Sequence, residues 1–127
     1  MILRLLTLRV RAGREAAFVE QADQVTEWAK TIPGLRYVRV ARRVEPDGSQ
    51  VVLFVMEWQD AESLYAWNAH PETVGQGPLN DGNDPHWDDA HVTLWEVVDA
   101  PLRQAMERWE ASLVPPDVQR ASPDART

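Results

Sequence analysis

The sequence contains no cysteine, and this absence excludes several kinds of site at once. Without thiols a protein has no disulfides, no thiolate nucleophile, no iron–sulfur cluster and no cysteine-based zinc site. Any chemistry that the chain performs must therefore use oxygen, nitrogen and aromatic side chains.

Long hydrophobic runs are also missing from the 127 residues. No stretch of about 18 uncharged apolar residues occurs, and the opening MILRLLTLRVR lacks the order of charge, apolar run and cleavage site that marks a signal peptide. We therefore expect a cytoplasmic protein. The length and the 44% content of hydrophobic residues are ordinary for one globular domain.

Basic residues are absent from one third of the chain. Residues 60–99 carry nine acidic and no basic side chains, and the net charge of the whole sequence is -7. An acidic protein gains nothing from counterion release on nucleic acid, and this one has no cationic amphipathic face for an anionic membrane. We expect neither nucleic acid nor membrane as a partner.

The apolar residues that are present predict an α+β fold of the order βαββαβ, the split-βαβ or ferredoxin-like arrangement. The predicted strands are residues 2–11, 35–44, 50–58 and 91–98. The stripe of a first helix consists of Phe18, Ala22, Val25, Ala29 and Ile32. Pro33 and Gly34 end that helix. A second helix begins after Asp60, which can cap it, and runs to about His70, where Pro71 limits it.

Two segments lie outside this unit, which occupies residues 1–98. Residues 71–90 form a connection of about 20 residues, longer than compact domains usually have without a functional or interface reason, and we interpret it as a lid or arm. Residues 99–113 predict an extra C-terminal helix, whose apolar stripe is Leu102, Ala105, Met106, Trp109 and Leu113. Residues 114–127 include three prolines and predict a disordered tail.

Strand 50–58 predicts an association of two copies. Its core, VVLFVM, is apolar on both faces, whereas the two helices of a split-βαβ unit cover only one side of the sheet. A second copy of the chain would cover the other side. We therefore expect a homodimer built sheet against sheet.

The order of several motifs resembles the antibiotic biosynthesis monooxygenase family over residues 1 to about 98. These motifs are a Gly-Arg-Glu helix start, IPGLRYVRVARR, a Pro-Asp-Gly hairpin and VVLFVMEWQDAESLYAW followed by AHPE. Most of the resemblance rests on two motifs. One is the Pro-Gly before the second strand, and the other is the pattern Glu-Trp, acid, Glu-Ser-Leu in residues 57–64. The resemblance implies a dimeric α+β barrel, in which two sheets pack face to face with the helices outside.

The resemblance also implies an activity. Characterised members oxygenate aromatic polyketides in an apolar pocket without metal or flavin, so no cofactor is expected here, and Asn, Trp and Tyr side chains are their proposed participants. A related branch degrades haem with an Asn on strand one, a Trp on helix two and a His about three turns later. Trp67 matches the second of these, but strand one has no Asn and Gly77 stands ten residues after Trp67, which disfavours haem degradation.

The stretch WQDAESLYAWNAHPE, residues 58–72, supplies the candidate site. We expect Tyr65 and Asn68 to donate to an enolate oxygen, His70 to accept a proton, and Trp67 to stack on an aromatic substrate. His70 suits a base at neutral pH because the usual pKa of histidine is about 6.5. The other residues expected to bind substrate are Trp58, Arg39 and Trp95.

Each of these residues also has a purely structural interpretation. An indole such as that of Trp67 is most often part of a core, and Tyr65 and Asn68 may simply face water. A histidine in the last turn of a helix is favoured by the helix dipole. Arg39 lies on a strand predicted at the sheet edge, where charges discourage unwanted pairing; if it pointed into the barrel, it would hold a carboxylate or enolate.

A metal site is the weaker alternative. His86, Asp88, Asp89 and His91 are suitable ligand types, but their spacing matches no compact metal motif. Two function classes therefore stay open. One is a cofactor-independent monooxygenase acting on a small planar aromatic or quinol-like molecule; the other is a non-catalytic dimer of the same fold that binds a small apolar ligand or serves in assembly.

Overall fold

The computed structural model describes residues 1–71, 73–74, 77–80, 85–99 and 101–107. Its elements are β1 (Ile2–Val10), α1 (Glu15–Ala29), β2 (Leu35–Val44), β3 (Gln50–Trp58), α2 (Ala61–Trp67), the 3₁₀ turn η1 (Pro78–Asn80), β4 (Trp87–Glu96) and α3 (Leu102–Glu107). The predicted βαββαβ order is confirmed. No helix in these ranges is long and apolar enough to cross a membrane.

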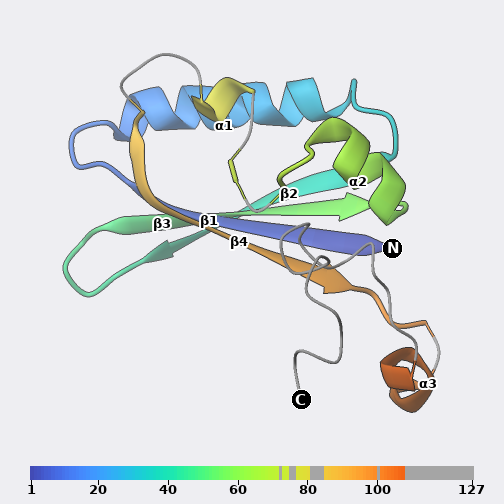
Figure 1. The fold of residues 1–127 in the computed structure, drawn as a ribbon. Helices are drawn as coiled ribbons and strands as arrows, with labels where there is room; N and C mark the ends of the chain where they lie inside the picture. Colours follow the sequence, from blue (N-terminus) through green and yellow to red (C-terminus); the bar gives the residue numbers. More distant parts are fainter. Residues whose placement is uncertain (72, 75–76, 81–84, 100, 108–127) are drawn as a thin grey trace.

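The four strands form one antiparallel sheet in the order β2-β3-β1-β4. β1 lies in the centre, paired with β3 from Ile2 opposite Trp58 to Arg9 opposite Val51, and with β4 on its other side. β2 pairs only with β3 and forms one edge, as the sequence predicts. Figure 1 shows α1 and α2 crossing the same side of this sheet.

The residues before β2 and α2 explain where these two elements begin. Gly34, at a φ of 82°, lets the chain leave α1 and enter β2, a conformation in which a residue with a Cβ is strained. Asp60 caps α2, because its carboxylate accepts a hydrogen bond of 2.8 Å from the backbone N–H of Ser63. The sequence predicted this cap.

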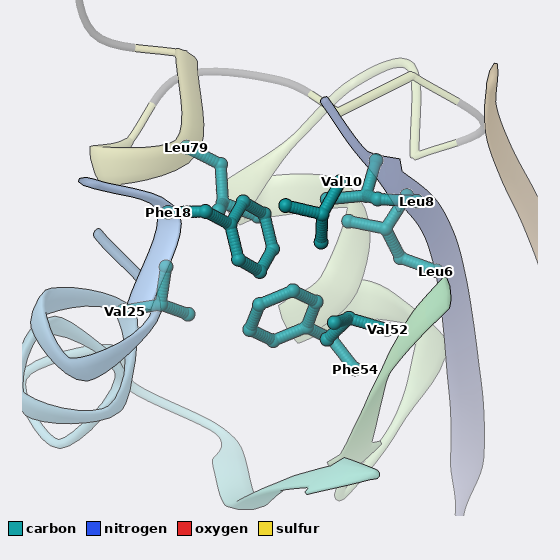
Figure 2. Close-up of a cluster of buried hydrophobic side chains, with 8 residues drawn as sticks. All are labelled: Leu6, Leu8, Val10, Phe18, Val25, Val52, Phe54 and Leu79. Atoms are coloured by element: carbon teal, nitrogen blue, oxygen red, sulfur yellow. The ribbon is translucent and has the colours of Figure 1, made fainter. Parts of the chain in front are cut away.

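The core lies between the sheet and α1. The even-numbered residues of β1 and β3 are buried against the helices, and the odd-numbered ones are not. Figure 2 shows Phe18 of α1 facing Phe54 of β3, with an edge-to-face contact of 6.4 Å between the ring centroids. Leu79 of η1 adds to the same cluster. η1 is therefore part of the packed layer above the sheet.

The opposite face of the sheet carries a half-buried apolar patch among polar side chains. Leu3 and Leu5 of β1 lie beside Leu53 and Val55 of β3 on this face, which we call the outer face. α1 and α2 lie on the other side of the sheet (Figure 1). Trp95, opposite Leu3 on β4, is 55% exposed. Surfaces of this kind usually contact another molecule.

Several boundaries differ from the prediction: α1 already ends at Ala29, β1 and β4 end at Val10 and Glu96, and the largest differences are in α2 and at the start of β4. α2 ends at Trp67 rather than His70, because the Asn68 side chain accepts a hydrogen bond of 2.9 Å from the backbone N–H of His70, and such local bonds compete with the helix. β4 begins at Trp87 rather than residue 91, since its pairing with β1 continues past an irregularity between Thr7 and Arg9. The predicted 71–90 connection is thus shorter and contains η1.

The C-terminal predictions are only partly covered by the structure. α3 occupies Leu102–Glu107 within the predicted 99–113 helix, and Leu102 and Met106 are 61% and 76% exposed. Residues 108–113 of that helix and the predicted 114–127 tail lie outside the described residues.

Candidate functional site

A small cavity lies between the sheet and the helices. Strand residues contribute Arg4, Leu6, Phe54 and Met56 to its wall, the helices contribute Val25, Trp28 and Trp67, and the following segment contributes Val74, Gly77, Pro78 and Leu79. The space open to the centre of a water-sized sphere is about 20 Å³, which is room for about one water molecule. Apart from Arg4, this wall is apolar or aromatic.

Arg4 is the buried charge of this cavity, with an exposed fraction of 1%. Its Nε donates to the carbonyl oxygen of Pro71 at 2.9 Å, and its Nη2 donates to the carbonyl oxygen of Thr73. Nη1 lies 3.7 Å from the sulfur of Met56. A buried guanidinium requires such acceptors, since removing it from water without them is costly. Arg4 therefore joins the central strand to the segment after α2.

Trp67 lies beside the guanidinium of Arg4 and packs with two further indoles. The Arg4 Cζ lies 5.1 Å from the ring centroid of Trp67, within the range of a cation–π contact. The Trp67 ring is 5.2 Å from Trp58 and 5.9 Å from Trp28 between centroids. Trp58 is fully buried, and its Nε1 has no hydrogen-bond partner among the described residues. Trp67 thus lies at the centre of a packed aromatic group and also in the cavity wall.

The Trp28 ring packs tightly against the backbone at Gly77, in the cavity wall. A Cβ added to Gly77 would lie 2.7 Å from the Trp28 ring, closer than real Cβ contacts. Only glycine allows the backbone this approach. Neither Trp28 nor Arg4 was predicted from the sequence as a site residue. For Arg4 a signal exists, because it shares the even-numbered face of β1 with Ile2, Leu6, Leu8 and Val10.

An open groove adjoins the cavity on the outside. The groove lies between the end of α1 and α2, and its space open to the centre of a water-sized sphere is about 560 Å³. Its lining includes Ile32, Pro33, Ser63 and Ala66. Trp28 and Trp67 line both the groove and the cavity. The two indoles therefore separate the outer space from the inner one.

Trp67, predicted to stack on the substrate, is part of the cavity wall, whereas the three predicted catalytic residues are not. Tyr65 is half-buried and packs against the core cluster around Trp58. Asn68 is half-buried; its Oδ1 accepts the bond from His70, and its Nδ2 is buried without a hydrogen-bond partner in the described ranges. His70 is exposed. Tyr65, Asn68 and His70 follow Trp67 closely in sequence but lie outside the cavity lining.

The other predicted binding residues divide between the two faces of the sheet. Trp58 packs behind Trp67 on the cavity side. Arg39 and Trp95 belong to the outer face, because they pair in register with Val55 and Leu3. The sheet therefore separates these two side chains from the cavity of their own chain.

Polar groups on the outer face interact with one another. The guanidinium of Arg39 lies 5.1 Å from the Tyr37 ring centroid, and Trp95 Nε1 donates to the Thr93 hydroxyl at 2.8 Å. A hydrogen bond with Glu57 raises the pKa of Tyr37 above its usual value. These contacts are sufficient to explain the positions of Arg39 and Trp95.

The residues considered as a metal site pair mainly with arginines. Arg11 Nε lies 2.9 Å from Asp88, and Arg9 Nε lies 3.3 Å from Asp89. His86 Nδ1 is 3.2 Å from Arg14 Nη1. Within the described part of the chain, no group of three or more His, Asp and Glu side chains is placed to hold a metal ion. Asp88 and Asp89, at the start of β4, instead form ion pairs with arginines at the end of β1 and just after it.

A four-stranded antiparallel sheet with α1 and α2 on one side, in βαββαβ order, defines the ferredoxin-like α+β class. A sequence model described as antibiotic biosynthesis monooxygenase matches residues 1–75, more than half of the chain. The chain belongs to this family. A search of curated proteins finds no match.

Solved structures of similar fold agree with this membership. A putative antibiotic biosynthesis monooxygenase from Deinococcus radiodurans is 16% identical with a TM-score of 0.62, over 80% of this chain and 96% of the other. One from Bacillus cereus is 16% identical with a TM-score of 0.54, over 80% and 94%. The heme-degrader MhuD from Mycobacterium tuberculosis, with two hemes in its active site, is 18% identical with a TM-score of 0.55, over 80% and 99%. At these identities the likeness shows the fold alone.

Proposed function

We propose that the protein is a cofactor-independent monooxygenase that oxidises a small planar aromatic or quinol-like molecule bound against Trp67, in the open groove between the end of α1 and α2. Membership of the monooxygenase family supports a reaction with oxygen. The observation that carries the proposal is the position of Trp67, whose indole forms part of an apolar wall between sheet and helices. An indole offers a flat surface on which an aromatic ring can stack.

The reaction needs no external reductant if the substrate supplies the electrons. A methylene group next to a carbonyl and an aromatic ring first loses a proton to give an enolate. Reaction with O₂ then converts CH₂ to C=O and releases one molecule of water, so atoms and electrons balance. The protein must exclude water, hold the enolate and accept its proton.

Residues next to Trp67 are proposed for two of these tasks. The Nδ2 group of Asn68 is buried and has no partner among the described residues, so it is available to donate to an enolate oxygen. Tyr65, on the same helix, is a second donor in the proposal. His70 is exposed and is proposed to pass the proton to solvent.

Haem fits this chain less well than a small aromatic. The linings of the cavity and of the groove contain no histidine among the described residues. β1 has no asparagine, and Gly77 stands ten residues after Trp67, where the resemblance to haem degraders asked for a histidine. We derive no reaction step through haem.

A ligand-binding or assembly role without catalysis is the second candidate. The small volume of the cavity favours it, because a filled interior is what a non-catalytic module requires. Oxygen uptake separates the two candidates. Purified protein, washed with a chelator, is mixed with anthrone in an oxygen electrode, and the product is analysed by mass spectrometry with labelled O₂.

The monooxygenase proposal expects protein-dependent uptake and a product that has gained one labelled oxygen and lost two hydrogens. Asn68→Ala should lower turnover about a hundredfold, since removing one oxyanion donor commonly has this effect. Trp67→Phe should also lower turnover, whereas the matched control Trp95→Phe, on the outer face, should not. Uptake no faster than in buffer, for every anthrone and quinol tested, leaves the binding module as the function.

We also propose that a second copy of the chain covers the outer face. Leu3, Leu5, Leu53 and Val55 form an apolar surface there, and Trp95 is 55% exposed beside it. Hydrophobic surface of this extent favours association, and a symmetric dimer buries the same patch on both copies.

A further inference from the structure

We infer that the aromatic molecule bound in the groove between α1 and α2 carries a cationic nitrogen, which the carboxylates of Asp60 and Glu62 attract. The inference rests on the proposed function in one respect, namely that a planar aromatic binds against Trp67. It adds the charge of that molecule and the side chains that select it.

The wall of the groove is acidic. Asp60 and Glu62 line it, and its lining contains no lysine, arginine or histidine among the described residues. Both acidic side chains are exposed, and exposed carboxylates are ionised at neutral pH. An anion in the groove would therefore meet charges of its own sign, whereas a cation would meet charges of the opposite sign.

Glu62 is the carboxylate that is available to a ligand. Asp60 accepts a hydrogen bond of 2.8 Å from the backbone N–H of Ser63, so part of its charge serves the start of α2. This bond is the main cause of the lowered pKa of Asp60, and the ammonium group of Met1 lowers it least. Glu62 forms no hydrogen bond or ion pair within the described ranges. It can therefore pair with a cation without losing a contact of its own.

Two indoles line the groove together with these carboxylates. The ring centroids of Trp28 and Trp67 are 5.9 Å apart, and their planes meet at 53°. The face of an indole attracts a cation as well as a flat aromatic ring. Arg4 contacts Trp67 but belongs to the wall of the cavity, not to that of the groove. The groove therefore favours a cationic aromatic over an anionic one of the same shape.

The spacing along α2 defines the shape of the ligand. Trp67 follows Glu62 by five positions, which is about 7.5 Å along a helix axis. Ser63 and Ala66, which have small side chains, also line the groove. The space of about 560 Å³ lies within the range of small-molecule sites. The arrangement fits a planar ring against Trp67 that carries an amine on a short arm toward Glu62.

Three probes of similar shape test the inference by calorimetry. At neutral pH 2-naphthylethylamine is a cation, 2-naphthylethanol is neutral and 2-naphthylacetate is an anion. Wild-type protein should bind the amine about three to thirty times more tightly than the alcohol, the range of one exposed ion pair and one cation–π contact. It should bind the acetate more weakly than the alcohol. High salt should reduce both differences, because the carboxylates are exposed.

Glu62→Gln removes the charge and keeps the size of the side chain. In this variant the amine should lose most of its advantage over the alcohol, whose own affinity should be unchanged. Asp60→Asn, which keeps a capping oxygen, should also reduce the advantage. Glu20→Gln is the matched control, since it makes the same change at an exposed position of α1 outside the groove lining. This control should keep the preference of the wild type.

Four results would overturn the inference. They are equal binding of the three probes, no binding of any of them, a preference for the acetate, and an amine advantage that survives Glu62→Gln or disappears in Glu20→Gln.

The indole N–H signals in NMR spectra locate the bound probe. Nitrogen-labelled protein gives one such signal for each tryptophan, and the signals missing from Trp28→Phe and Trp95→Phe identify these two residues. The amine should shift the Trp28 signal and leave that of Trp95, which lies on the outer face, unchanged. A Trp28 signal that does not move at saturating amine refutes the site.

The result is distinguishable from failure of the proposed function. If no anthrone or quinol is oxidised but the amine preference depends on Glu62, the cation site stands and the protein is a binding module. If anthrone is oxidised and the amine has no advantage over the alcohol, the monooxygenase stands and the inference about charge is wrong.

Discussion

Replacing Gly34 by alanine tests how closely the turn before β2 packs against α2, the helix that carries Trp67. Gly34 has a φ of 82°, and a residue with a Cβ pays about 1–2 kcal/mol in that conformation. An added Cβ would also lie 2.3 Å from the Oγ and 2.4 Å from the Cβ of Ser63 on α2. Overpacking of this kind typically costs a further 1–3 kcal/mol. We expect Gly34→Ala to lower the free energy of unfolding by about 2–5 kcal/mol.

Two other glycines separate the backbone effect from the contact with Ser63. Gly13 and Gly48 have φ values of 81° and 86°, and a Cβ at either one meets nothing within 4 Å. Gly13→Ala and Gly48→Ala should therefore cost only about 1–2 kcal/mol, the conformational part. Urea denaturation measures all three variants under the same conditions.

A double variant checks the cause. Ser63→Gly removes both atoms that the new Cβ would meet, so Gly34→Ala should cost less in that background than in the wild type, by about 0.5–3 kcal/mol. If Gly34→Ala is no more destabilising than Gly13→Ala, or if Ser63→Gly gives no relief, the close packing of this turn against α2 is wrong.

Three further predictions concern the aromatic group, the cap of α2 and the association of two copies. Trp67→Phe should destabilise the fold by about 1–3 kcal/mol in urea denaturation, because its ring contacts Trp28 and Trp58; a loss below about 0.5 kcal/mol would contradict this packing. The Ser63 amide lowers the pKa of Asp60 in the folded state, so the cap stabilises the protein fully above the ordinary pKa of an aspartate and less as the pH falls through the lowered value. The difference in Tm between wild type and Asp60→Ala should therefore be present at pH 7 and shrink below about pH 4, and a difference that is constant with pH contradicts this. Light scattering at micromolar concentration should give twice the mass of the 14.4 kDa chain, and a monomer mass would refute the proposed dimer.

The order of elements could be predicted because short-range patterns carry it. The short apolar run in 50–58 and the spacing of Phe18, Val25 and Ala29 each indicate one type of element, and Gly34 and Asp60 mark where the next one begins. These signals involve residues only a few positions apart. The sheet edge at β2 followed from the split-βαβ order alone.

The contents of the cavity could not be predicted in the same way. Arg4 donates to carbonyls that lie 67 and 69 residues further along the chain, and no local pattern reveals such partners. A charged residue on a strand is usually exposed. The even spacing of Arg4 with Leu6 and Leu8 therefore does not by itself predict a buried guanidinium. The face of Arg39 was equally uncertain, since β2 carries arginines on both sides. Only the register with β3 places it away from Trp67.

The most direct test of the account is a crystal structure of the protein with bound anthrone. We predict the ring against Trp67, in the groove between the end of α1 and α2. A structure in which saturating ligand leaves this groove empty, or in which the ligand lies on the outer face of the sheet, would contradict the claim that the functional site lies at Trp67.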